Sequence, residues 1–362
     1  MGRKIIDVNT NVTPFVTNKN KDGIDPRGSR PKFWFTFNDD EEKSKWMFKN
    51  KNRDANGKIQ TYEDIGEIIF QYICEQVDMP CAVYELAQKE QDGEMIDGVI
   101  SKSYLPEKPY EISGYALLDM SKNFDYDNLF GQKSTFENTI KNYIYGLKVY
   151  HYANPKVKID TNKITLQIEK MFILDYLCAQ ADRNWYNLSF ILDKSNHEFV
   201  MAPLFDNGNI FCWNHKESVI EHQNTALTNK YKYNVLAELL SSKPIAMGIS
   251  TPTALRDPKN PLRTLKSNQN AETMQYVEKE LVEMICSSPK LLEFVQNNFQ
   301  EDNQIIDTAF AKFNETYNES YPTLQSQSKK IFALRSKHLI ELVNEKLKQM
   351  STEEENEDEY NI

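Results

Sequence analysis

Hydrophobic and polar residues follow different patterns in the two halves of the chain. Short apolar runs between polar turns predict strands at 33–37, 45–49, 82–87 and 98–104, and apolar residues at helical spacing predict a helix over 62–77. Helical spacing dominates the later part of the chain, at the ranges 136–150, 164–181, 271–286, 289–298, 303–315 and 322–349. A β-rich part followed by a helical part predicts an α+β fold.

Three polar stretches lack such a pattern. Residues 1–24 are rich in Asn, Lys and Thr, which predicts a loosely held arm. Residues 244–270 contain four prolines among polar and basic residues and are expected to form a long surface loop. The last twelve residues, 351–362, contain six acids and no basic residue, which predicts a disordered tail.

A predicted hairpin lies at the centre of the sequence pattern. Its two apolar runs, 188–192 and 199–205, are joined by a turn rich in Asp, Lys, Ser and Asn. Three polar side chains border it: Asp182, Asn187 and Asp206. Folding the strands back on each other brings Asp206 beside Asn187, although 19 residues separate them in the sequence.

An acid, an amide and a second acid in this arrangement match the working part of a phosphotransferase. Asp182 would orient or deprotonate an acceptor hydroxyl. Asn187 and Asp206 would hold Mg²⁺ against nucleotide phosphates, because Mg²⁺ binds a few hard oxygen ligands together with phosphate. The alternative is a surface hairpin whose Asp and Asn residues only shape turns. The functional interpretation is favoured because Asp206 closes an apolar strand and Asp182 follows a long apolar helix.

Residues 168–211 resemble the catalytic core of the HipA-like serine/threonine kinases, including their short, CtkA-type bacterial members. That family has an apolar helix, an Asp-Arg-His-x-x-Asn motif, a hairpin and a Pro-x-Phe-Asp metal motif. Here residues 182–187 read Asp-Arg-Asn-Trp-Tyr-Asn and residues 203–206 read Pro-Leu-Phe-Asp. Asn184 therefore stands where the family usually has His, and the resemblance makes Asp182 and Asn184 the candidate catalytic residues.

The resemblance implies a two-lobed protein-kinase-like fold that uses ATP and Mg²⁺. The small N-lobe, an antiparallel β-sheet with one helix, is expected at 25–118. The larger and mainly helical C-lobe is expected at 119–350, with the arm and the tail outside the two lobes. In such a fold Asn187 and Asp206 are the metal ligands.

A turn before the first aromatic strand is the candidate nucleotide loop. It contains Gly28, Ser29, Arg30 and Lys32, and such a turn can present backbone N–H groups and basic side chains to phosphate. Alone it indicates no more than a turn before a strand. HipA-like kinases carry a similar Gly-x-x-Pro-Lys or Gly-x-Gln-x-Lys sequence here, and many have a regulatory serine three residues before the glycine. That position is Asp25 in this chain.

Two further residues complete the expected nucleotide site. Lys49 ends a short apolar strand and could reach nucleotide phosphates as a point charge; the alternative is a solvated lysine in a basic stretch. In kinases a helix glutamate pairs with this lysine. Glu67 resembles that glutamate, with Glu63 as the alternative residue and an exposed position in the first helical turns as the alternative role.

Composition limits which cellular compartments and which classes of binding partner are expected. The five cysteines are scattered and odd in number, so they indicate no disulfide framework and favour a reducing, cytoplasmic compartment, with a secreted effector as the alternative. The net charge of −10 argues against general nucleic-acid binding. We also expect no membrane segment, since no apolar run approaches the ~20 residues that a membrane helix needs.

Three function classes remain open. The first is an ATP-dependent serine/threonine protein kinase, whose partner is a protein with a Ser or Thr acceptor. The second is a kinase of a small molecule or of phosphatidylinositol on the same scaffold, and the third is a catalytically silent nucleotide-binding fold. The set of Asp182, Asn187, Asp206 and Lys49 favours the first two classes. Membership of a toxin–antitoxin pair would add a small antitoxin-like partner.

Overall fold

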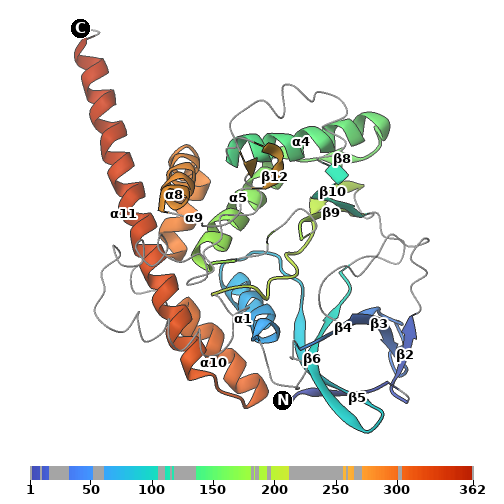
Figure 1. Ribbon diagram of the computed structural model, residues 1–362. Coiled ribbons are helices and arrows are strands. Elements are labelled where there is room, and N and C mark those ends of the chain that lie inside the picture. Colours follow the sequence, from blue (N-terminus) through green and yellow to red (C-terminus); the bar gives the residue numbers. More distant parts are fainter. Residues whose placement is uncertain are drawn as a thin grey trace.

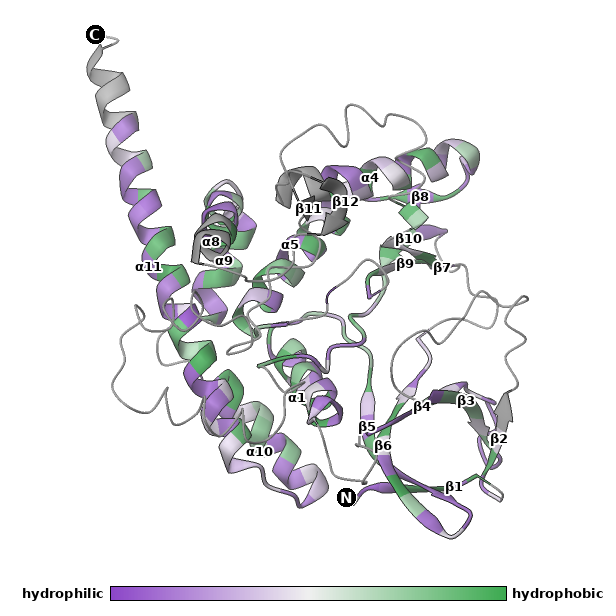
Figure 2. Cartoon of the chain, in the orientation of Figure 1, coloured by the Kyte–Doolittle hydropathy of each residue, from purple (hydrophilic) through white to green (hydrophobic). Residues whose placement is uncertain are grey.

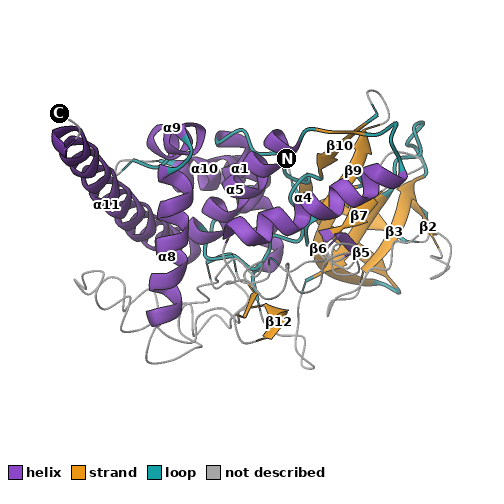
Figure 3. Ribbon diagram, turned by 90° about the horizontal axis from the view of Figure 1, so that it is seen from above, coloured by secondary structure: helices purple, strands orange, loops and turns teal. Residues whose placement is uncertain are grey.

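The computed structural model describes most of the chain, with gaps. The described residues are 2–8, 10–15, 32–51, 61–104, 111–114, 116–117, 136–180, 183, 187–193, 197–211, 256–257, 260–264, 271–300 and 304–360. They form a mixed arrangement of sheets and helices. Figure 3 shows most strands gathered on one side and most helices on the other, with the helix α4 reaching between them.

The larger sheet has six strands in the order β1-β5-β6-β4-β3-β2. Their bounds are β1 Lys4–Asp7, β2 Val12–Phe15, β3 Lys32–Phe37, β4 Trp46–Asn50, β5 Tyr84–Gln91 and β6 Glu94–Lys102. The strands predicted from the apolar runs are therefore present, with shifted ends. All neighbouring strands run antiparallel except β1 and β5, which are parallel. The expectation of a purely antiparallel sheet is wrong at this edge.

The six-stranded sheet curls around a small apolar cluster of its own (Figure 1). The buried members of this cluster are Ile6, Val12, Phe35, Phe48, Ala87 and Ile100. Because β1 and β2 each contribute one of these residues, the prediction of a loosely held arm over 1–24 is wrong for residues 4–7 and 12–15. Residues 16–24 lie outside the described part of the chain.

The helices correspond closely to the predicted helical spacing. Their bounds are α1 Glu63–Gln76, α4 Phe136–Ala153, α5 Thr161–Leu177, α8 Ala271–Cys286, α9 Pro289–Asn298, α10 Ile305–Tyr317 and α11 Pro322–Tyr360. The start of α5 is fixed by Asp160, whose carboxylate accepts a hydrogen bond from the backbone N–H of Lys163 at 3.0 Å. None of the helices in the described residues is long and apolar enough to cross a membrane.

The prediction of a disordered tail over 351–362 is wrong for residues 351–360, which belong to the last helix, α11, while residues 361–362 lie outside the described part of the chain. Helix α11 continues to Tyr360 and projects away from the other elements (Figure 1). The buried apolar residues of α11 lie in its inner part, at Leu324, Ile331, Phe332, Leu339 and Val343, and the coloured residues farther out are mostly polar (Figure 2). Glu is a good helix former, and extending an existing helix costs less than starting a new one. The acidic sequence therefore continues the packed helix.

The predicted hairpin around the central motif is confirmed. Strands β9, Ser189–Asp193, and β10, Glu198–Met201, pair antiparallel. They form a four-stranded sheet with β7, Glu111–Ser113, and β8, Lys158–Ile159, in the order β7-β9-β10-β8. Strands β11, Arg256–Asp257, and β12, Asn260–Thr264, pair antiparallel within the range 244–270, where a long surface loop was expected; the rest of that range lies outside the described residues.

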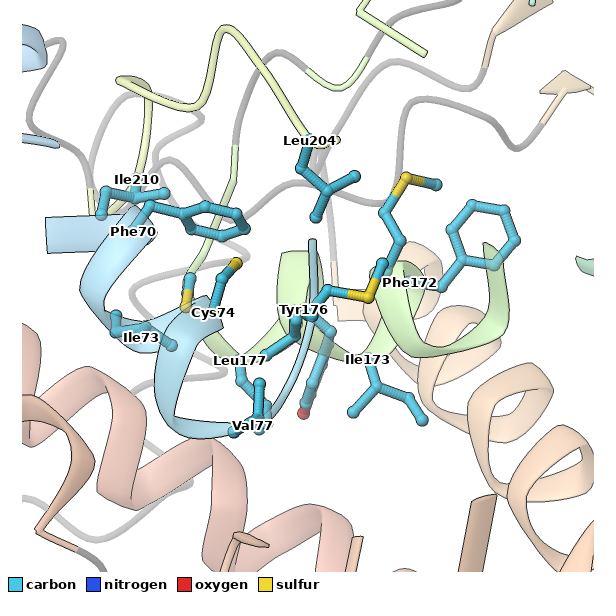
Figure 4. Packing of buried hydrophobic residues seen from close by; sticks show 14 of the residues in the cluster. Phe70, Ile73, Cys74, Val77, Phe172, Ile173, Tyr176, Leu177, Leu204 and Ile210 are labelled. Carbon is cyan, nitrogen blue, oxygen red and sulfur yellow. The ribbon is translucent and has the colours of Figure 1, made fainter. Parts of the chain in front are cut away.

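One continuous apolar core joins α1, α5, the inner side of β5 and β6, and the helices from α8 to α11. In Figure 4, Phe70 and Cys74 of α1 lie close to Leu177 of α5, with Leu204 and Ile210 packed over them. The chain segment that follows β10 is thereby anchored on the α1–α5 core. The four cysteines in the described part of the chain are free thiols.

A cavity of about 830 Å³ lies between α4, α5 and α8. Its lining includes Glu169, together with the charged residues Lys141, Lys148, Glu280 and Glu283. Burial raises the pKa of Glu169 to about 7, from a usual value near 4.5. The folded state therefore keeps a proton that the unfolded chain has released between these pH values, and stability falls as pH rises through that window.

Glu169→Gln is expected to remove this pH dependence. The variant and the wild type should melt at similar temperatures near pH 4.5, and the variant should melt higher above pH 7, because no carboxylate is then ionised inside the cavity wall. Thermal unfolding followed across this pH range measures the difference. Glu341→Gln, at an exposed position of α11, is the matched control. Parallel pH curves for wild type and Glu169→Gln would contradict the prediction.

Candidate active site

Lys49 lies where the large sheet meets α1 and the segment after β10. Its Nζ lies 2.9 Å from Oε1 of Glu67 and also contacts the carboxylate of Asp206. The side chains of Lys49 and Glu67 are 6% and 0% exposed, while that of Asp206 is 32% exposed. A buried ammonium group needs such partners, because an unpaired charge in the interior is costly. Three elements distant in sequence are thus joined at one cation.

Glu67 also binds the segment after β10 directly. Its second carboxylate oxygen accepts a hydrogen bond from the backbone N–H of Asn207 at 2.6 Å. Glu63, the alternative partner considered for Lys49, instead accepts a hydrogen bond from the Thr61 hydroxyl at 3.1 Å. The predicted pairing of Lys49 with a glutamate of the helix is therefore made by Glu67.

Two glycines allow α1 to approach this segment closely. A Cβ added to Gly66 would lie 2.4 Å from the carbonyl oxygen of Gly208, and a Cβ added to Gly208 would lie 2.4 Å from the carbonyl oxygen of Glu63. Both contacts are with backbone, which cannot turn aside as a flexible side chain can. Backbone therefore packs directly on backbone here, and this packing sets the distance between Glu67 and Asp206.

Gly208→Ala is expected to lower the free energy of unfolding by about 1–3 kcal/mol, because the added methyl group overlaps the first turn of α1. Urea unfolding measures this loss. Gly2→Ala is the control, because a Cβ at Gly2 meets nothing within 4 Å. Equal stability of Gly208→Ala and wild type would show that α1 is free to shift away from the segment.

Asp206 occupies an unusual backbone conformation. Its φ is +55°, a left-handed value that Asp tolerates better than most residues. Its backbone N–H donates a hydrogen bond to the hydroxyl oxygen of Tyr84 at 3.0 Å. Burial, together with the nearby charges of Glu67 and Asp206, raises the pKa of Tyr84 well above its usual value, so this hydroxyl stays protonated. The turn holds the Asp206 carboxylate at an accessible edge of the core.

Arg183 connects the two halves of the central motif. Its Nη1 donates to the carbonyl oxygen of Asn187 at 3.2 Å and to that of Phe205 at 3.0 Å. A single side-chain nitrogen thus bridges Asn187, two residues before β9, and Phe205, the residue preceding Asp206. The bridge brings the backbone of Asn187 close to that of Phe205, and the adjacency of the Asn187 and Asp206 side chains stays a prediction.

Asp175 of α5 holds Arg183 from the other side. Nε of Arg183 lies 3.0 Å from Oδ2 of Asp175, and neither side chain is more than 1% exposed. Burial raises the pKa of Asp175, and the charge and hydrogen bonds of Arg183 act against this rise. Asp175 thereby braces the central motif from α5.

The predicted nucleotide residues are described only in part. Lys32 of β3 lies directly opposite Lys49 of β4, so both lysines are on the same face of the sheet. Gly28, Ser29 and Arg30 lie outside the described residues. The candidate catalytic residues, Asp182 and Asn184, also lie outside them.

The residues present fit a magnesium ion bound together with phosphate. The described residues contain no group of three or more His, Cys, Asp or Glu side chains that could hold a metal by themselves. One amide and one carboxylate, from Asn187 and Asp206, lie on neighbouring segments joined through Arg183. Such a partial set of oxygen ligands is typical of Mg²⁺ sites that share the ion with a nucleotide.

Three residues of this site had no role assigned from the sequence: Arg183, Asn207 and Tyr84. Arg183 and Asn207 belong to the motif itself, where a polar residue next to a candidate ligand was the available signal. Tyr84 lies 122 residues before Asp206 and is one of 19 tyrosines, so no local pattern marks it. It is found only through its contact with the Asp206 backbone.

No family model and no curated protein matches the sequence of this chain. Among solved structures, the chain is similar to the Helicobacter pylori proinflammatory kinase CtkA, with a TM-score of 0.56 and 14% identity, over 93% of this chain and 98% of that chain. The chain has the fold of this kinase. A second similarity is to a chain of the Shewanella oneidensis MR-1 toxin–antitoxin complex of HipA, HipB and operator DNA.

That second similarity has a TM-score of 0.47 and 10% identity, over 91% of this chain and 70% of that chain, and it adds nothing to the conclusion on the fold. The similarity to the Helicobacter pylori structure extends along nearly the whole chain, so the shared fold includes both the sheet with α1 and the helical part. The mixed sheet-and-helix architecture expected from the sequence is thereby confirmed at the level of the fold.

Proposed function

We propose that this protein is an ATP-dependent serine/threonine protein kinase of HipA-like type that works with Mg²⁺. The observation that carries the proposal is the contact of Lys49 with both Glu67 and Asp206. Phosphoryl transfer requires a cation for the nucleotide phosphates, an acid that positions this cation and a carboxylate for the metal. Three separate elements supply these groups at one point.

In the proposed reaction, Lys49, held by Glu67, binds phosphate oxygens of ATP. Asn187 and Asp206 would hold Mg²⁺, and the ion would neutralise charge on the phosphates. Asp182 positions the acceptor hydroxyl and takes its proton. The hydroxyl oxygen forms a bond to the γ-phosphorus as the bond to the leaving oxygen of ADP breaks. Asn184 stands in this loop in place of the usual histidine.

We also propose that the fold works as two lobes with the nucleotide between them. The N-lobe, 25–118 together with β1 and β2, carries the facing lysines Lys32 and Lys49. The C-lobe, 119–350, carries Asn187 and Asp206. The acceptor is proposed to be a protein Ser or Thr. An antitoxin-like partner and a cytoplasmic location stay predictions from the sequence.

The test is transfer of radiolabelled γ-phosphate to the protein itself or to a generic basic protein, with ATP binding followed by calorimetry with and without MgCl₂. Incorporation that requires Mg²⁺ and yields acid-stable phosphoserine or phosphothreonine is the expected result. Incorporation only into lipid or small-molecule acceptors would favour the second function class. Tight ATP binding without transfer to any acceptor would favour a silent fold, and binding indifferent to Mg²⁺ would contradict the proposed metal ligands.

A further inference from the structure

A buried pair of residues, Arg183 and Asn207, connects three segments that carry candidate site residues: the start of the hairpin at Asn187, the turn around Asp206, and α1 through Glu67. Nη2 of Arg183 donates to Oδ1 of Asn207 at 2.6 Å, while Nη1 bridges the carbonyl oxygens of Asn187 and Phe205. The fixed fork of a guanidinium suits this task, because its N–H groups point in set directions within one plane.

Asn207 extends the connection toward the lysine and its glutamate. Its backbone N–H donates to Glu67, and its Nδ2 donates to the carbonyl oxygen of Leu204 at 3.1 Å. The side chain therefore closes the turn around Asp206 from within, and the same residue ties this turn to α1. The Asn207 side chain uses both its donor and its acceptor in these contacts.

Neither residue is placed to touch a substrate. Arg183 is 1% exposed and Asn207 is 0% exposed, whereas the Asp206 side chain between them is 32% exposed. Stability alone does not require a charged group at this point, since buried ion pairs can often be replaced by apolar residues without loss. The contacts of Arg183 are instead directed at the backbone carbonyls of Asn187, a predicted ligand, and of Phe205, the residue before the other predicted ligand.

We propose that Arg183 and Asn207 are positioning residues that fix the spacing between Asn187 and Asp206 and thereby set the affinity of the nucleotide-bound Mg²⁺. The inference rests on the proposed function. It adds that Asn187 and Asp206 are held in place through backbone carbonyls and through the turn around Asp206. The hydrogen bonds of Arg183 and Asn207 that do this belong to the same network that holds Glu67. Loss of a group that orients metal ligands typically weakens metal affinity about 10–100-fold.

Arg183→Lys tests the inference, because lysine keeps a positive charge beside Asp175 and loses the fork that bridges two carbonyls. ATP binding is measured by calorimetry at stepped MgCl₂ concentrations. The concentration of Mg²⁺ that gives half-maximal ATP binding is expected to rise about 10–100-fold, while ATP affinity at saturating Mg²⁺ stays near that of the wild type. Asn207→Ala is the second variant, and it is expected to raise the same Mg²⁺ midpoint. It replaces Arg183→Lys in the test if that variant does not fold.

Arg335→Lys is the matched control. Arg335 is another buried arginine, 1% exposed, which donates to the backbone carbonyl of Tyr176 and lies over the ring of that residue. This control is expected to lower the melting temperature and to leave the Mg²⁺ midpoint unchanged. The same midpoint in wild type, Arg183→Lys and Asn207→Ala would overturn the inference while the proposed function stands. Wild-type ATP binding that ignores Mg²⁺ would overturn both.

Discussion

Asp206→Ala is expected to weaken Mg²⁺-dependent ATP binding by at least about 100-fold. Residues that only orient a metal ligand already contribute about 10–100-fold to metal affinity, so a direct ligand contributes no less. The fold should survive, because the side chain is 32% exposed and Lys49 keeps its contact with Glu67. Calorimetry with and without MgCl₂ measures the loss, and circular dichroism checks the fold.

Backbone strain is the main complication in this experiment. At φ +55° alanine costs roughly 1 kcal/mol more than Asp or Asn. Asp206→Asn therefore provides the control, since it tolerates the turn and removes only the charge. Both variants should lose most metal dependence, with Asp206→Asn retaining the wild-type melting temperature more closely. If both variants unfold, or if both bind ATP with the wild-type response to Mg²⁺, the residue is structural.

Asp182→Asn is expected to slow phosphoryl transfer by about 10²–10⁴-fold with little change in ATP affinity. General-base and positioning contributions have this magnitude, and they are made mainly in the transition state. ATP itself would still be held by Lys49 and by the metal ligands. The measurement is the initial rate of radiolabel incorporation, with ATP binding followed in parallel.

Asp193→Asn makes the same chemical change at the far end of β9 and is expected to keep the wild-type transfer rate. Equal rates for wild type and Asp182→Asn would remove the catalytic role assigned to that residue. A parallel loss of ATP affinity would instead indicate that Asp182 belongs to the nucleotide site. The two results separate catalysis from binding.

The sequence predicted those parts of the fold that depend on local periodicity. The helix α1 begins and ends within one residue of its expected range, and the hairpin of β9 and β10 forms between the two apolar runs. Each of these elements buries a face that can be recognised from alternation or helical spacing along the chain. The contact of Lys49 with Glu67 could be expected only through the resemblance, because 18 residues separate them.

Other features were missed because their stability comes from distant partners. Strand β1 has only four residues, and only Ile6 points into the apolar cluster enclosed by the six-stranded sheet. No alternating pattern in the sequence therefore indicates this strand. Arg183 and Asn207 are polar residues in loops, and ordinary loop residues look the same in the sequence. Their roles follow from hydrogen bonds to backbone groups, which leave no trace in residue type.

The direct packing of Gly66 on Gly208 has a consequence for inhibitor design. Because α1 and the Asp206 turn touch backbone to backbone and share the Glu67 hydrogen bond, neither can be displaced without moving the other. A compound that binds by pushing the helix outward would have to open the Lys49 contacts and the turn in one step. Compounds shaped to the assembled arrangement avoid that energetic penalty, so we expect screening to yield ligands that compete with the nucleotide.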